Sequence, residues 1–458
     1  MGRENIEKWD WRYSFLKHYV NFSFRSFFKE LTVSGKENIP ENTPIIFAPN
    51  HQNALMDALA ILYTTNDQPV FLARSDIFKK KLIAIILTFL KILPIYRIRD
   101  GYGNLKLNDY IIKKIHAILS KNHYLVIFPE GNHGDKRQLR NLKKGITRIA
   151  FQSEEEYDYK LGVKIVPVGL DYTNYYKFKE NLFVNFGKPI DLDQFFPLYK
   201  ENPSKAHLAL RKEISTQLKK YMIHIDNQEY YETINASREI YKYRMKEVLQ
   251  IPSLKQPYKF KADKKLIQLC EKIQENKPEQ LAELDVKVKE YRKLLKSLNI
   301  DYHAIPEKKS ITPIIIPGIT SLILFSPIFL YGWINNLLSY YPAVHFSKKM
   351  RDPQFISSIK YGIGMVTFPL FYLIQTLLVY AFTKEIYITL GYLLSIPLTG
   401  YFAFYYQQLF KILKKKIRLN NIFRKKPETY KKLTRLKKDI IDKIDEWVNQ
   451  YDINDGSI

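Results

Sequence analysis

The chain has 458 residues, enough for two or three domains, and its 72 Lys and Arg against 46 Asp and Glu give a net charge of +26. Such a basic surface suits phosphates, anionic lipid headgroups or nucleic acid, although a general bias toward Lys, Ile, Asn and Tyr explains part of the excess. The single cysteine, Cys270, excludes an intrachain disulfide framework and is typical of a reducing compartment. The first ten residues are charged and lack an apolar core, so we expect no secretory signal peptide.

The first predicted element lies in residues 1–33. Residues 9–31 are rich in Trp, Tyr and Phe, with Arg and Lys interspersed among them. A helix with this many charges does not cross a bilayer, but an aromatic and basic helix suits the plane of a membrane interface. A helix that packs into the protein core is the equal alternative.

Strands alternate with helices between residues 34 and 195. This alternation predicts an α/β domain with a mostly parallel central sheet flanked by helices. The helix at 77–91 is apolar almost throughout, so it either lies buried or dips into lipid. The predicted strands are 44–49, 69–73, 92–97, 123–128, 163–170 and 182–186, and the predicted helices are 54–64, 77–91, 104–121 and 140–153.

Residues 196–310 are rich in Lys and Glu and poor in residues that favour strands. We interpret them as a helical insertion or lid, in which prolines separate the helices and no residue cluster indicates chemistry. The predicted helices are 204–226, 228–249, 262–275 and 278–298.

Residues 311–410 have the composition of membrane helices, and a basic tail, 411–458, follows them. The stretches 361–382 and 386–409 are each long enough to cross a bilayer, and their short connector predicts a hairpin. Residues 311–338 contain three prolines, and we interpret them as a Pro-broken hairpin or a re-entrant segment. Lys and Arg flank these segments, so the positive-inside rule predicts cytoplasmic flanks. A buried helical bundle is the alternative for the block.

The stretch from Asn50 to Asp57 carries the first candidate chemistry. It joins an apolar strand to an apolar helix, so His51 lies at a strand-to-helix junction with Asp57 six positions later. Histidine side chains titrate near neutral pH, and one held by a carboxylate can take a proton from a substrate hydroxyl. Positions six apart do not share a helix face, so the two meet only if the chain bends before the helix. For this pair alone, a solvated surface contact is the alternative.

Three further stretches come at the ends of predicted strands in the same domain. The first ends in Arg97, the second is Phe128-Pro129-Glu130-Gly131, and the third is the apolar run around Pro167. Ligands of open α/β sheets bind beyond the carboxyl ends of the strands, where a guanidinium can hold a phosphate. Glu130 can accept a hydrogen bond from a substrate hydroxyl or hold that arginine.

In this order the four stretches resemble the motifs of the glycerolipid acyltransferases, the family that includes glycerol-3-phosphate and lysophosphatidate acyltransferases. The resemblance covers roughly residues 30–195. The carboxylate comes one residue later than in the common Asn-His-x4-Asp motif, and this His-x5-Asp spacing resembles the fungal glycerol-3-phosphate acyltransferase branch.

The resemblance implies direct acyl transfer in phospholipid synthesis. His51, held by Asp57, would deprotonate the glycerol hydroxyl, and the alkoxide would attack a fatty acyl thioester of coenzyme A or acyl carrier protein. Backbone N–H groups near the strand-to-helix turn would stabilise the oxyanion. The sequence has no Gly-x-Ser-x-Gly motif, which argues against an acyl-enzyme, and the reaction needs neither a metal nor another cofactor. The residues that would bind substrate are Asn50, Arg97, Glu130 and Gly131.

The predicted partners are membrane lipids and the acyl donor, acyl-CoA or acyl carrier protein, with no nucleic acid. The predicted location is the inner (cytoplasmic) membrane, with the catalytic domain on its cytoplasmic side. Two alternatives stay open, an enzyme of the same fold acting on another lipid acceptor such as a lyso-aminolipid, and a non-catalytic membrane scaffold. The pair of His51 and Asp57 weighs against the scaffold.

Overall fold

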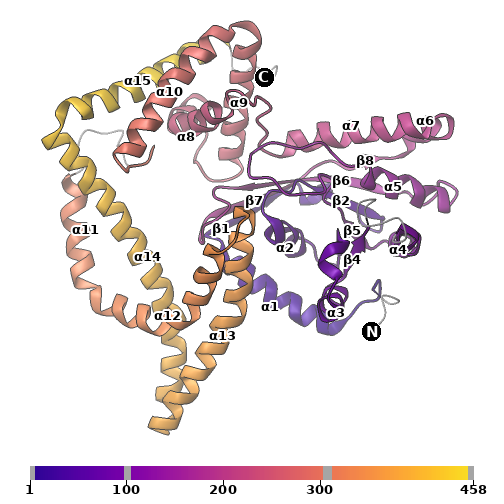
Figure 1. Ribbon diagram of the computed structural model, residues 1–458, viewed down its shortest axis with the longest axis horizontal. Coiled ribbons are helices and arrows are strands. Elements are labelled where there is room, and N and C mark those ends of the chain that lie inside the picture. Colours follow the sequence, from indigo (N-terminus) through magenta and orange to yellow (C-terminus); the bar gives the residue numbers. More distant parts are fainter. Residues whose placement is uncertain (1–5, 97–104, 303–311, 452–458) are drawn as a thin grey trace. The chain divides into compact units, whose positions relative to one another are not determined.

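The computed structural model describes residues 6–96, 105–302 and 312–451 (Figure 1). The chain divides into two compact units. The first runs to His224 and also includes Ser347–Tyr361, and the second contains Ile225–Phe346 and the chain from Gly362 onward. This division lies after the boundary predicted at residue 195, because α7 (Pro203–Tyr221) packs on the sheet of the first unit.

The first unit contains a mostly parallel sheet, which confirms the predicted α/β class. The strand order is β1-β7-β6-β2-β5-β3-β4, with β8 paired to β6. Only the pairs of β6 with β7 and with β8 are antiparallel among the described residues. The six predicted strands are confirmed to within two residues, and β1 and β8 were not predicted. The bounds are β1 Glu30–Ser34, β2 Ile45–Pro49, β3 Val70–Arg74, β4 Ile92–Ile95, β5 Tyr124–Val126, β6 Lys164–Tyr172, β7 Asn181–Phe186 and β8 Ile190–Asp191.

Helices cover both faces of this sheet (Figure 1). On one face α4, α5 and α7 bury apolar side chains in a common core with the strands, and on the other face lie α1 and α2. Successive side chains of β2 point to opposite faces of the sheet and so contribute to both sides. Ile46 belongs to the core with α4, α5 and α7, while the ring of Phe47 packs on Tyr124 and Phe186. The helix bounds are α1 Trp11–Phe27, α2 Ala54–Thr64, α3 Lys81–Phe89, α4 Leu105–Leu119, α5 Gly145–Glu156 and α6 Phe196–Glu201.

Two helices of the first unit expose apolar side chains. α1 buries one face, including Val20 and Phe24, but leaves Phe15 and Phe22 on its other face exposed. α1 therefore packs one face into the core and presents an apolar surface on the other face. α3 buries none of its residues and exposes Leu82 together with three isoleucines, so the helical part of the apolar run at 77–91 is not in the core, although Phe78 before it is buried.

The Ser347–Tyr361 segment belongs to the first unit although it is distant in sequence. The Tyr361 hydroxyl donates to the Val20 carbonyl at 3.0 Å, and its ring packs edge-on against Phe24 and Phe27 of α1. The Lys360 ammonium donates to the carbonyl of Tyr176 at 2.9 Å. These contacts fix the end of the segment to the rest of the first unit.

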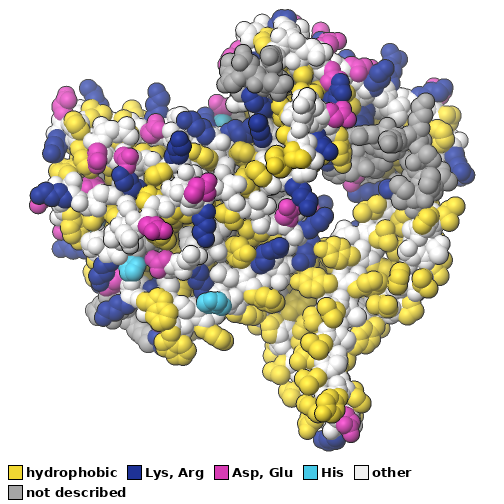
Figure 2. Space-filling model, turned by 180° about the vertical axis from the view of Figure 1, so that it is seen from behind, with side chains coloured by type: hydrophobic (Ala, Val, Ile, Leu, Met, Phe, Trp, Pro, Cys, Tyr) yellow, Lys and Arg dark blue, Asp and Glu magenta, His cyan; other side chains and the backbone are white. Residues whose placement is uncertain are grey.

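Among the described residues, two apolar helices are long enough to cross a membrane. One candidate span is Pro353–Thr383, whose most apolar window has no buried residue, and the other is Ile386–Lys425. Figure 2 shows hydrophobic side chains over most of the surface of this hairpin. The preceding apolar pair is bent by 60° at a short break, as expected for a Pro-rich broken or re-entrant stretch. The bounds are α11 Thr312–Leu324, α12 Ser326–Lys348, α13 Ile356–Thr383 and α14 Ile386–Lys425.

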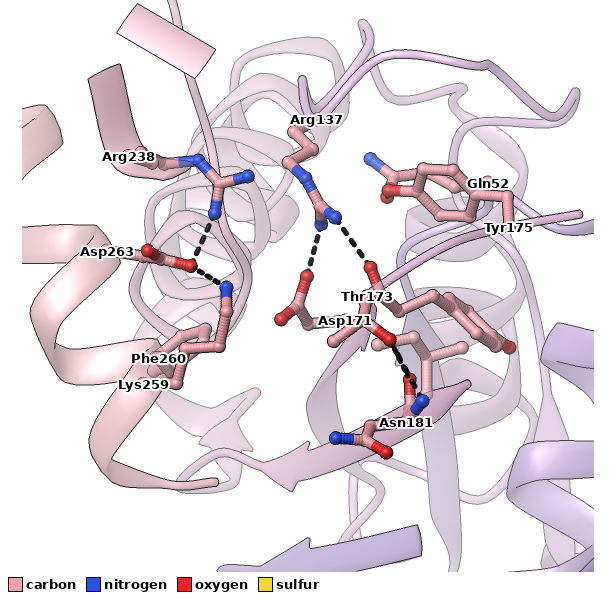
Figure 3. A network of polar contacts seen from close by, with 12 residues as sticks. Gln52, Arg137, Asp171, Thr173, Tyr175, Asn181, Arg238, Lys259, Phe260 and Asp263 are labelled. Atoms are coloured by element: carbon pink, nitrogen blue, oxygen red, sulfur yellow. Dashed lines mark hydrogen bonds and ion pairs between the residues drawn. The ribbon is translucent and has the colours of Figure 1, made fainter. Parts of the chain in front are cut away.

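The remaining helices of the second unit pack together as α8 (Tyr231–Val248), α9 (Tyr258–Asn276), α10 (Pro278–Ser297) and α15 (Pro427–Gln450). The first three lie where helices were predicted, and residues 427–450, predicted as part of a basic tail, form a packed helix. Apolar residues recur every three or four positions in α15, and this stripe is buried from Leu433 to Trp447. Cys270 of α9 is fully buried. A buried ion pair of Arg238 with Asp263 joins α8 to α9 (Figure 3).

Candidate active site

The turn of residues 50–53, called the catalytic turn after the role predicted for His51, brings His51 and Asp57 together. β2 ends at Pro49 and α2 begins at Ala54, whose φ of +42° lies in the left-handed region. The bend lets Asp57, in the first turn of α2, reach back toward His51, with 2.9 Å between Nδ1 and Oδ2. The Asp57 side chain is fully buried, whereas that of His51 is 16% exposed. One partner is thus enclosed and the other remains open to a ligand.

Asp57 is held by neighbours on both of its oxygens. Oδ2 accepts from the backbone N–H groups of Gln52 and Asn53 at 2.8 and 2.7 Å, and Oδ1 accepts from the Tyr172 hydroxyl at 2.8 Å. Burial, together with the charge of Asp57, raises the pKa of Tyr172 well above its ordinary value, so this phenol stays protonated and donates. With these donors in place, the carboxylate accepts the Nδ1 proton of His51 and leaves Nε2 as the basic nitrogen.

A buried cation supports the strand that carries Tyr172. Arg137 forms an ion pair with Asp171 and donates to the Tyr172 carbonyl at 2.6 Å (Figure 3). Figure 3 also shows Gln52 beside Tyr175, whose hydroxyl donates to the Gln52 amide oxygen at 2.6 Å. The hydroxyls of Tyr172 and Tyr175 therefore join the end of β6 and the loop after it to Asp57 and to the catalytic turn.

Glu130 connects the catalytic turn to an arginine. One carboxylate oxygen accepts from the His51 backbone N–H at 2.7 Å, and the other accepts from Arg140, through its backbone N–H at 3.1 Å and its Nε at 3.3 Å. Burial raises the pKa of Glu130, and these donors oppose the shift. Gly131 has a φ of +70°, and a Cβ there would meet the Lys143 side chain at 3.0 Å. The sharp turn after Glu130 thus requires glycine.

The other predicted substrate contacts have different positions. Arg97 lies outside the described residues. Asn50 is fully buried, and its amide both donates to and accepts from the backbone of Leu170, at 3.2 and 2.6 Å. Contact of Asn50, Glu130 or Gly131 with substrate stays a prediction.

The prediction for the oxyanion needs a correction within the catalytic turn. The backbone N–H of His51 donates to Glu130, and those of Gln52 and Asn53 donate to Asp57. Because these three amides already have carboxylate acceptors, they do not offer an oxyanion hole.

Two rings border the imidazole of His51. Phe128 stacks on it with 4.1 Å between ring centroids, and His133 lies edge-on at 5.6 Å. Burial, and then the proximity of His51, lowers the pKa of His133, which favours the neutral ring. Neither His133 nor Tyr172 was predicted from the sequence. Their only signal was position, because each lies within three residues of a predicted motif or strand end.

Comparison with known proteins finds similarity to acyltransferases. The sequence model of the acyltransferase family matches residues 30–171. Glycerol-3-phosphate O-acyltransferase 1 of Saccharomyces cerevisiae is 23% identical over 368 residues, 74% of this chain and 47% of that protein. The 1-acyl-sn-glycerol-3-phosphate acyltransferase of Borreliella burgdorferi is 29% identical over 160 residues, 34% of this chain and 57% of that protein. The chain thus spans about half the length of these two relatives.

A solved structure is also similar over part of the chain. It is the 1-acyl-sn-glycerophosphate acyltransferase PlsC of Thermotoga maritima, with 19% identity and a TM-score of 0.32, covering 44% of this chain and 78% of that one.

Proposed function

Residues 30–171 belong to the glycerolipid acyltransferase family, and from this we propose that the protein moves a fatty acyl group from a thioester to a hydroxyl of a glycerol phosphate. One observation carries the proposal. His51 is open to a ligand, and it is paired with Asp57, which is buried and whose carboxylate oxygens are held by His51, Gln52, Asn53 and Tyr172.

The residues of the site suit direct transfer. Nε2 of His51 takes the proton of the acceptor hydroxyl while Asp57 stabilises the imidazolium that forms. The hydroxyl oxygen bonds to the thioester carbonyl carbon, and the carbon–sulfur bond breaks as the tetrahedral intermediate collapses. The imidazolium then returns the proton to the departing thiolate, so that ester and thiol leave and the enzyme is unchanged.

Arg140 supports a phosphate-bearing acceptor. Its Nε and backbone N–H are held by Glu130, while its Nη2 is buried and has no hydrogen-bond partner among the described residues. A guanidinium fixed in this way can hold a phosphate without losing side-chain freedom when it binds. We assign it to the acceptor phosphate together with Arg97, which was predicted from the sequence.

The acceptor we favour is glycerol 3-phosphate, because the match to the yeast glycerol-3-phosphate acyltransferase extends over 74% of this chain. The alternative is 1-acylglycerol 3-phosphate. The test is an assay of the purified full-length protein in mixed micelles, offering each acceptor with acyl-CoA and with acyl carrier protein, with the His51→Ala variant as control. Transfer to neither acceptor would refute the proposal.

The apolar surfaces of the chain support a membrane-bound enzyme. The described part of the chain contains two candidate spans, and α1 and α3 add exposed apolar side chains. We place it in the cytoplasmic membrane with the acyltransferase domain on the cytoplasmic side, because Lys and Arg flank the apolar region and a coenzyme A or carrier-protein donor is soluble there.

A further inference from the structure

The catalytic turn contacts a residue more than 300 positions away in sequence. The Ser357 hydroxyl, near the start of α13, donates to the Asn53 side-chain oxygen at 2.6 Å, and both side chains are buried. The backbone N–H of Asn53 in turn donates to the Asp57 carboxylate at 2.7 Å. A single residue of the turn thus joins Ser357 to the partner of the catalytic histidine.

A second contact from the same segment reaches the histidine side of the pair. The His133 Nδ1–H donates to the Gln354 side-chain oxygen, and the ring of Phe355 packs edge-on against His133 at 4.8 Å. Asp352 lies 3.7 Å from the same nitrogen. His133 in turn contacts His51, with 5.6 Å between the centroids of the two rings.

These contacts are part of a structured attachment. Asp352 accepts from the backbone N–H of Gln354 at 3.1 Å and so caps the short turn of Pro353–Phe355. At the other end, Lys360 and Tyr361 are bonded to the first unit as described above. Gln354 and Ser357 lie between two fixed points and are therefore held in place.

We propose that two residues of this segment, Ser357 and Gln354, are positioning residues for the pair of His51 and Asp57. The segment lies outside the family domain at residues 30–171. Ser357 and the candidate span belong to one helix, α13, so the element that would enter the membrane also begins at the catalytic turn. The inference rests on the proposed function, because it concerns the geometry of the proposed general base.

The chain supplies a matched control for the test. Ser358 is the next residue of α13 and is also buried, but its hydroxyl has no hydrogen-bond partner in the part of the chain that the structure describes. Ser357→Ala and Ser358→Ala therefore remove the same group from adjacent buried positions. Only the first of them breaks a bond to the catalytic turn.

The experiment measures kcat and both KM values of the full-length enzyme in mixed micelles. We expect Ser357→Ala to lower kcat about five- to tenfold, which is the effect of one misplaced hydrogen bond, and to leave both KM values unchanged. Ser358→Ala should retain the wild-type kcat. Asn53→Ala should match Ser357→Ala, and the double variant should lose no more than either single variant, because both remove one bond. Gln354→Leu should lower kcat, and Gln354→Glu, which keeps the acceptor, should restore it.

Several results would overturn the inference. One is a wild-type kcat in Ser357→Ala, and another is an equal loss in both serine variants, which would indicate helix packing alone. A rise in KM at constant kcat would make the segment a substrate contact instead. A wild-type enzyme that transfers to no glycerol phosphate acceptor would overturn the proposed function and this inference together, whereas an active wild type with an unaffected Ser357→Ala variant would overturn the inference alone.

Discussion

Replacing Asp57 by Asn removes one charge from the site and little else. The amide oxygen of Asn can accept from the Gln52 and Asn53 backbone N–H groups and from His51, as Oδ2 of the carboxylate does. The amide NH2 group can donate to the Tyr172 hydroxyl, which then acts as acceptor in place of donor. The variant should therefore fold with the imidazole in its wild-type position. Its loss of activity should then measure the contribution of the Asp57 charge to catalysis.

The expected loss follows from the separation of the two groups. At 2.9 Å a full charge pair is worth about 6 kcal/mol with an effective dielectric constant of about 20. A neutral hydrogen bond keeps roughly half the strength of a charge-assisted one, which leaves a loss of about 3 kcal/mol in the transition state. That loss corresponds to a kcat roughly 150-fold lower.

The assay compares kcat and KM of wild type, Asp57→Asn and His51→Ala on the preferred acceptor, with thermal unfolding as the control for folding. Removing the base altogether in His51→Ala should lower kcat by roughly 100-fold or more. The acceptor KM of Asp57→Asn should stay close to that of the wild type, because the charge acts only as the imidazolium forms. An Asp57→Asn enzyme within about threefold of the wild-type kcat would refute the assignment of His51 as a base assisted by this carboxylate.

Three further predictions concern the phosphate, a buried acid and the membrane. Arg140→Ala and Arg97→Ala should each raise the acceptor KM at least tenfold and leave the donor KM unchanged; an equal effect on both substrates in steady-state kinetics would remove that arginine from the acceptor site. Burial raises the pKa of Glu130 from its ordinary 4.5, so the stability it contributes is complete below pH 4.5 and is lost as the pH rises toward the folded-state pKa. In denaturant titrations, the free energy of unfolding of Glu130→Gln should therefore increase relative to that of the wild type as the pH rises through this window. A cysteine introduced at Lys384, between the two candidate spans, should react with an impermeant maleimide from the side opposite the cytoplasm, and labelling from the cytoplasm would show that the hairpin does not cross.

The parts of the site that are local in sequence could be predicted. The interval from Asn50 to Asp57 follows directly on a strand end and contains the turn and the helix start, so the meeting of histidine and carboxylate followed from a pattern of eight residues. Tyr172 is 115 positions from Asp57, and Ser357 is 304 positions from Asn53. Such pairs depend on the order of strands in the sheet and on a chain that returns to it, which no local pattern contains.

The fold shows the same division between local and distant information. Strands buried on both faces, such as β2, were predicted because they are continuous apolar runs. β1 is a half-buried strand at the sheet edge, and β8 has two residues, so neither carries such a signal. The charges of residues 411–458 indicated a basic tail, although α15 within it buries an apolar stripe from Leu433 to Trp447.

The burial of Cys270 makes the protein suitable for site-specific cysteine labelling. The thiol of this α9 residue is fully buried, and burial raises its pKa to about 12. Almost no thiolate is therefore present at neutral pH. Because the thiolate is the species that alkylating reagents attack, the folded wild-type chain should be silent toward maleimides although it contains a cysteine. Probes for fluorescence or spin labelling can then be introduced one at a time at chosen positions, and the native thiol can stay in place.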